Sequence, residues 1–156
     1  MASDETMGAR EQAQLAARHI CVINGDPGFL NLMRDLLQDE AYNVTTTNFV
    51  PATFAQVAAL QPDLLLIDLA IGRRAGGELL ARLHATAATT GLPVIIVSTQ
   101  PAYLERARAQ AARYGAAGLL AKPFDLADLL ALVRAALARP QAVPGVLSGK
   151  LGQARQ

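Results

Sequence analysis

The sequence contains no tryptophan, a single cysteine and few aromatic residues, and each shortage excludes a class of protein. The one cysteine, Cys21, cannot form an internal disulfide, and with only two histidines it cannot build a cysteine–histidine metal cluster. Aromatic residues make up 4% of the chain and the formal net charge is +1, so neither a base-stacking surface nor a basic field is indicated. We therefore expect a reduced protein with no cofactor and no nucleic-acid partner.

Long hydrophobic runs are also missing. Residues 1–18 are polar and mixed in charge, without the apolar stretch of a signal peptide. The apolar runs, such as 64–67 and 93–97, are far too short to cross a bilayer. We expect a cytoplasmic protein with no membrane partner. Its composition, 52% hydrophobic and 17% charged residues, is typical of one folded domain.

Five short apolar or β-branched runs alternate with segments of helical spacing. The expected strands are residues 20–23, 43–47, 64–67, 94–97 and 117–121. The expected helices start at Pro27 with Asp26 as N-cap, cover 51–60, follow a glycine-rich loop at 72–77, cover 102–114, and run from the N-cap Asp125 to about Arg139. The alternation predicts an α/β fold, a doubly wound parallel sheet with helices on both faces. Residues 19–139 form this domain, between an N-terminal extension, 1–18, and a flexible tail, 140–156.

Polar residues follow four of the expected strands directly. They are Asn24, Asp68, Ser98 and Lys122. Ligands of open parallel sheets bind outside the carboxyl ends of the strands, so these side chains are expected at one edge. The chain has only two lysines, Lys122 and Lys150, against twelve arginines, and Lys122 is the only lysine in the expected domain. The sequence thus places a carboxylate, a hydroxyl and an ammonium together.

The same residues carry a family resemblance that covers roughly residues 19–139. The motifs are Asp26-Pro27, the run 62–69 around Asp68, the run 92–98 ending in Ser98, and Gly115-Ala with Lys122-Pro123 and Phe124. In this order they resemble the receiver domain of bacterial two-component response regulators. The resemblance implies a flavodoxin-like sheet of five strands in the order 2-1-3-4-5, and a protein that transduces signals and is not an enzyme.

The resemblance also implies roles for residues. Asp68 would accept a phosphoryl group from a histidine kinase or phosphotransfer protein, with Ser98 and Lys122 contacting the phosphoryl oxygens. The Lys122-Pro123 bond would be cis. The residues lining the site would be Asn24, Gly25, Asp26, Ala70, Thr99 and Pro123. A downstream signalling protein, or a second copy through the face of the fourth helix, fifth strand and fifth helix, would be further partners.

Three departures from the family pattern affect this expectation. Asn24-Gly25 stands where the family carries two acidic residues that serve the Mg²⁺ site, and Asp26 is interpreted as a helix cap. With Asp26 and Asp68 as the only candidate ligands, Mg²⁺ binding is expected to be weak or absent and phosphorylation slow. The loop after Asp68 has Gly72 and Ala75 in place of a proline and an acidic residue, and the aromatic switch position is Leu119.

Three alternatives stay open. The first is an interaction module that works without phosphorylation, using a surface of helix 102–114 with Leu104, Ala107, Ala111, Tyr114, Arg106, Arg108 and Arg113. The second is a small phosphate-using enzyme; residues 72–77 resemble a phosphate loop, but Glu78-Leu79 replaces the required lysine and hydroxyl. His19, before the first strand, and His84, on a helix, form no catalytic set. The third is a piece of a longer DNA-binding regulator, although the residues after Arg139 are too few and too rich in glycine and proline to form a helix-turn-helix themselves.

Overall fold

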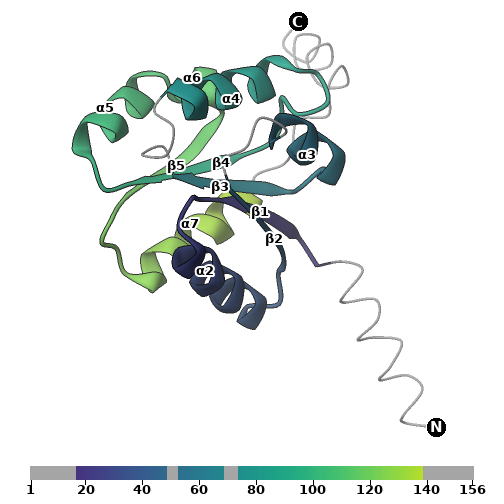
Figure 1. The fold of residues 1–156 in the computed structure, drawn as a ribbon, viewed down its shortest axis with the longest axis vertical. Coiled ribbons are helices and arrows are strands. Elements are labelled where there is room, and N and C mark those ends of the chain that lie inside the picture. Colours follow the sequence, from purple (N-terminus) through teal and green to yellow (C-terminus); the bar gives the residue numbers. More distant parts are fainter. Residues whose placement is uncertain (1–16, 49–52, 69–73, 139–156) are drawn as a thin grey trace, which may run out of the picture.

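A computed structural model of the chain describes residues 17–48, 53–68 and 74–138. Its centre is a five-stranded sheet in the order β2-β1-β3-β4-β5, with every neighbouring pair parallel (Figure 1). The strands are β1 (His19–Ile23), β2 (Asn43–Thr47), β3 (Leu64–Asp68), β4 (Val94–Ser98) and β5 (Ala116–Ala121). The strand order expected from the resemblance is confirmed.

Helices cover both faces of the sheet (Figure 1). They are α2 (Pro27–Asp39), α3 (Thr53–Leu60), α4 (Arg74–Ala85), α5 (Pro101–Ala109), α6 (Ala111–Tyr114) and α7 (Leu126–Ala138). Apolar side chains of α2 and α7 form one core with alternate residues of β1, β3 and β4, and those of α3, α4 and α5 form the other. Because both faces are covered, β3 and β4 are buried at every residue, which explains their continuous apolar runs. No helix in the described part of the chain is long and apolar enough to span a membrane.

Two element predictions are wrong in detail. The helix expected over 102–114 is divided at Gln110, whose φ of −115° and ψ of 22° leave the helical region, although no glycine or proline stands there. The short α6 turns onto α4, where a Cβ on Gly77 would lie 3.0 Å from Tyr114 Oη. The loop expected at 72–77 is also helical from Arg74 onward, and Gly77 within this helix lies close to Tyr114 of α6. Gly72 lies outside the described residues.

The starts of two helices and of the first strand can also be compared with the sequence predictions. Asp26 caps α2, as predicted: its side chain accepts the Gly28 N–H. The last helix begins directly after Asp125, whose carbonyl accepts the N–H groups of Asp128 and Leu129. His19 is the first residue of β1 and does not precede it, because its backbone pairs with Asn43 of β2. Its Nε2 also lies 2.7 Å from Thr45 Oγ1 on β2. The N-terminal extension up to residue 16 and the tail after Arg139 lie outside the described residues.

Cys21 makes protein stability depend on pH. The side chain is fully buried, and burial raises the pKa of its thiol from 9.0 to about 12. Above pH 9 only the unfolded chain forms the thiolate, so stability falls as the pH rises toward 12. The expected loss is about 1 kcal/mol per pH unit. Urea unfolding of the wild type and of Cys21→Val between pH 8 and 11 measures it, and equal pH slopes for the two proteins would contradict the assignment.

Candidate functional site

Four strand ends meet at one edge of the sheet. Asp68 is the last residue of β3 and Ser98 the last of β4, while Asn24 and Lys122 directly follow β1 and β5. The register pairs Asp68 with Val97 and Ser98 with Ala121, and the Lys122 N–H donates to the Ser98 carbonyl at 2.8 Å. The site expected from the sequence is therefore assembled by the parallel sheet itself.

Asp68 is the centre of this site. Its side chain is only 6% exposed, and Lys122 Nζ lies 2.5 Å from its Oδ2. Asn24 Nδ2 donates to the same oxygen at 3.3 Å, and Asn24 is itself buried. A carboxylate removed from water requires such partners, because an uncompensated buried charge is costly. Asp68, Lys122 and Asn24 thus form one hydrogen-bonded cluster.

Phe29 belongs to the site, and sequence reasoning missed it. Lys122 Nζ lies 3.9 Å from the centroid of the Phe29 ring, a cation–π contact. Phe29 stands in the first turn of α2 at helical spacing, and we interpreted it as a core residue. It does pack against the core cluster beneath α2 and α7. Its contact with Lys122 depends on where the chain directly after β5 lies in the fold, so the sequence offered no separate signal for that contact.

The loop after β1 is held by its own side chains. Asn24 Oδ1 accepts the Asp26 N–H at 2.8 Å, and Asp26 Oδ1 accepts the Gly28 N–H at 3.0 Å. Gly25 and Asp26 are exposed, whereas Asn24 points inward to Asp68. The Asp26 carboxylate is therefore engaged in capping α2.

The other residues expected to line the site differ in their surroundings. Ser98 is fully buried, and its Oγ accepts the Gln100 N–H at 3.0 Å. Thr99 and Pro123 follow their strand ends and are exposed, and the Lys122-Pro123 peptide bond is cis, as expected. Ala70 lies outside the described residues.

Comparison with known proteins fits this geometry. A family model described as "Response regulator receiver domain" matches residues 20–134, most of the chain. The chain belongs to this receiver family.

Several relatives are known by name. The receiver is 33% identical over 129 residues to "Phosphate regulon transcriptional regulatory protein PhoB" of Rhizobium meliloti, covering 83% of this chain and 55% of the relative. It is 30% identical over 125 residues to "DNA-binding dual master transcriptional regulator RpaA" of Synechocystis sp., covering 80% of this chain and 51% of the relative. The chain spans about half the length of these relatives.

Solved structures share the fold. The chemotaxis response regulator CheY4 of Vibrio cholerae matches with a TM-score of 0.68 at 21% identity, covering 78% of this chain and 99% of that protein. A response regulator protein from Burkholderia multivorans matches with a TM-score of 0.61 at 31% identity, covering 81% of this chain and 98% of that protein. The first shows the fold alone, and the second agrees with the family assignment.

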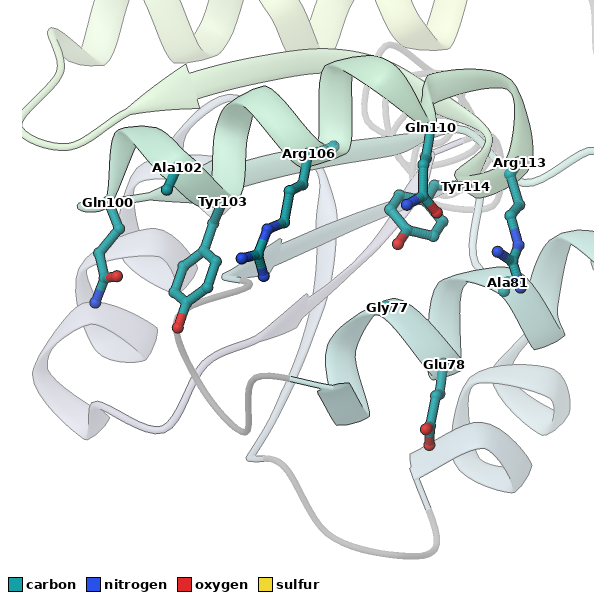
Figure 2. Close-up of a pocket in the computed structure, with 11 residues that line it drawn as sticks. Gly77, Glu78, Ala81, Gln100, Ala102, Tyr103, Arg106, Gln110, Arg113 and Tyr114 are labelled. Carbon is teal, nitrogen blue, oxygen red and sulfur yellow. The ribbon is translucent and has the colours of Figure 1, made fainter.

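Besides the polar cluster at the edge of the sheet, the receiver has a cleft of about 630 Å³ between α4 and the pair α5 and α6. Figure 2 shows Tyr103 and Arg106 extending from α5 and Arg113 extending from α6 toward α4, while Glu78 points away from them. Of the surface expected on helix 102–114, Leu104 and Ala107 are core residues instead, because the helix packs this face on the sheet. Leu119 on β5 is partly buried and also packs against that core.

Proposed function

We propose that this chain is an atypical receiver in a phosphorelay, with Asp68 as the inherited phosphoacceptor. The observation that carries the proposal is the buried Asp68 carboxylate at the carboxyl edge of the sheet, 2.5 Å from the Lys122 ammonium. The partner that fits this chemistry is a histidine kinase or a phosphotransfer protein, and the receiver then acts on a downstream protein. In this proposal the chain transfers a signal and turns over no substrate.

The chemistry needs three side chains. An Asp68 oxygen attacks the phosphorus of the donor, an O–P bond forms, and the bond from phosphorus to the donor's leaving group breaks. Lys122 then balances the charge of the added phosphoryl oxygens. Ser98 Oγ accepts the Gln100 N–H at 3.0 Å, and as a donor it makes only a long hydrogen bond, with 3.5 Å from Oγ to the Gln100 carbonyl oxygen. That hydroxyl can therefore turn to donate to a phosphoryl oxygen.

The described residues do not fit Mg²⁺, the ion that receivers of this family use. Mg²⁺ in such sites is held by one or two carboxylates together with waters and phosphate oxygens. Asp68 Oδ2 already contacts Lys122 and Asn24, and Asp26 caps α2. Within the described ranges, no three His, Cys, Asp or Glu residues are grouped to hold a metal. We therefore derive slow phosphorylation from the missing carboxylates at Asn24 and Gly25.

Intact-mass spectrometry with a small-molecule phosphodonor, with and without Mg²⁺, tests the phosphoacceptor. The wild type is expected to gain a phosphoryl adduct slowly or not at all, and Asp68→Ala to gain none. An ordinary receiver in the same donor solution is the control for an inert donor. A wild-type adduct that forms as fast as in the ordinary receiver and requires Mg²⁺ would contradict the impaired metal site.

Restoring the acidic pair is expected to restore the site. The double variant Asn24→Asp, Gly25→Asp should bind Mg²⁺ about tenfold more tightly or better, because affinity rises with the number of charged ligands. It should also gain the phosphoryl adduct on Asp68 more quickly than the wild type. Calorimetric titration with Mg²⁺ measures the affinity, and an affinity unchanged from the wild type would contradict our alignment of this loop.

A phosphorylation-independent interaction module is the second candidate, and the α4–α6 cleft favours it. Arg106 and Arg113 line the cleft, and no salt bridge joins either to a carboxylate of the described residues. An acidic segment of a partner protein would complement them. A second copy could instead dock on the face of α5, β5 and α7. If Asp68 takes no phosphoryl group even in the restored variant, this candidate replaces the first.

Nucleic-acid binding is not part of either proposal. The relative from Synechocystis is named as DNA-binding, and the chain covers 51% of it. The net charge of +1 gives this chain no basic field of its own to attract DNA.

A further inference from the structure

Asn24 is followed by a glycine, and this pair favours attack of the backbone nitrogen on the asparagine side-chain amide. The chain has four asparagines; Asn31, Asn43 and Asn48 precede leucine, valine and phenylalanine. A backbone nitrogen that follows an asparagine can attack the side-chain amide carbon, and a glycine there has no Cβ to hinder the approach. Asparagine is accordingly among the thermolabile residues. Of the four, Asn24 alone has this unhindered neighbour.

The fold prepares the Asn24 amide for such an attack. The Asp26 N–H donates to Asn24 Oδ1 at 2.8 Å, which holds the amide oxygen of the inward-pointing side chain against the following backbone. The same N–H would stabilise negative charge that develops on Oδ1, as the donors of an oxyanion hole do. Asn24 is buried but Gly25 is exposed, so water reaches this peptide unit from the Gly25 side. In the described part of the chain, the Gly25 N–H donates to no other residue.

We propose that Asn24 is a site of spontaneous deamidation, which creates a second carboxylate beside Asp68. The Gly25 backbone nitrogen bonds to Asn24 Cγ and loses its proton, while the bond from Cγ to Nδ2 breaks and Nδ2 leaves as ammonia carrying that proton. Water then opens the cyclic imide. Cleavage at Cγ gives aspartate, and cleavage at the main-chain carbonyl gives isoaspartate. The sum is one asparagine and one water converted to one acid and one ammonia.

The product changes the charge of the site. Asn24 Nδ2 lies 3.3 Å from Asp68 Oδ2, so the aspartate would bring a carboxylate oxygen against another carboxylate. Two carboxylates this close repel each other, and a bound cation relieves the repulsion. The aged chain should then bind Mg²⁺ more tightly than the new chain. This second consequence rests on the proposed function, whereas the deamidation does not.

The test follows the full chain during incubation in ¹⁸O-labelled water at mildly alkaline pH. Peptide mapping by mass spectrometry should show loss of the amide at Asn24, with one solvent oxygen incorporated. The rate at Asn24 should exceed that at Asn31, Asn43 and Asn48 by about tenfold or more, because only Asn24 precedes a glycine. Equal rates at the four positions, or an unchanged Asn24, would overturn the proposal.

Two glycine substitutions give a matched comparison. Gly25→Ala should slow the reaction at Asn24 about tenfold, because the added Cβ hinders the attacking nitrogen. Gly28→Ala makes the same change three residues away, where the Cβ would meet Asp26 Oδ1 at an ordinary 3.5 Å. It should leave the rate unchanged. Equal slowing by both would mean that loop stability, and not the attacking nitrogen, controls the rate, which also overturns the proposal.

Mg²⁺ titration of the single variant Asn24→Asp separates this inference from the proposed function. Tighter Mg²⁺ binding by Asn24→Asp without deamidation of the wild type would overturn the inference and leave the proposed metal defect standing. Deamidation of the wild type with no gain in affinity for Asn24→Asp would establish the modification and contradict its consequence for the metal.

Discussion

Replacing Lys122 with methionine is expected to lower the free energy of unfolding by about 3 kcal/mol. Methionine keeps the long apolar stem and can still contact the Phe29 ring through its sulfur. It removes the ammonium that lies 2.5 Å from Asp68 Oδ2. Asp68, only 6% exposed, would then keep a buried charge without its cationic partner. Urea unfolding monitored by circular dichroism measures the loss.

A double-mutant cycle isolates the pair from its surroundings. Asp68→Asn alone should cost less than Lys122→Met, because Lys122 is 18% exposed and its ammonium can move toward water. The double variant Asp68→Asn, Lys122→Met should lose less free energy of unfolding than the two single variants lose together, by about 1 kcal/mol or more. Additive losses would show that the two side chains do not stabilise each other, in contradiction to the cluster described above.

Replacing Gly115 with alanine is expected to cost about 2–3 kcal/mol. Gly115 has a φ of +66°, the left-handed region, in which an L-residue is disfavoured by about 1–2 kcal/mol. An added Cβ would also lie 3.1 Å from His84 Nδ1 and 3.3 Å from the Leu92 carbonyl oxygen. The carbonyl belongs to the backbone just before β4 and cannot rotate away. Thermal and urea unfolding of the variant measure the loss.

Gly118→Ala is the matched control for this prediction. Gly118 lies in β5 without a positive φ, and its added Cβ would meet Leu132 Cδ2 at 3.2 Å. That atom is the end of a flexible side chain, so a small rotation accommodates it. We expect a change below about 1 kcal/mol. A loss as large as that of Gly115→Ala would mean that crowding alone, and not the backbone conformation, governs both positions.

Much of the fold could be predicted because each buried strand has a direct signal in the sequence. The runs 64–67 and 94–97 are continuously apolar, as strands covered on both faces must be, and they lie in the middle of the sheet. Asp26-Pro27 marked the start of α2, since a carboxylate that caps a helix acts within a few residues. These signals are local, so one sequence contains them.

The polar cluster of the site was also predictable, for a topological reason. Parallel strands end at one edge, so Asp68 and Lys122 were expected at the same edge once the strands were assigned. Their mutual contact and the hydrogen bond from Asn24 agree with that expectation. The phosphoryl roles of Asp68, Ser98 and Lys122 come from the family resemblance and await the phosphorylation experiment.

The sequence by itself determined the parallel sheet, its two helical layers and the residues at the carboxyl edge, because periodicity and capping are properties of neighbouring residues. Only the tertiary structure decided that Phe29 covers the Lys122 ammonium and that the helix after β4 breaks at Gln110. The first contact joins residues 93 positions apart, and the short helix after the break packs Tyr114 close to Gly77 on α4. Such contacts depend on where whole elements lie relative to one another, and no local pattern records them.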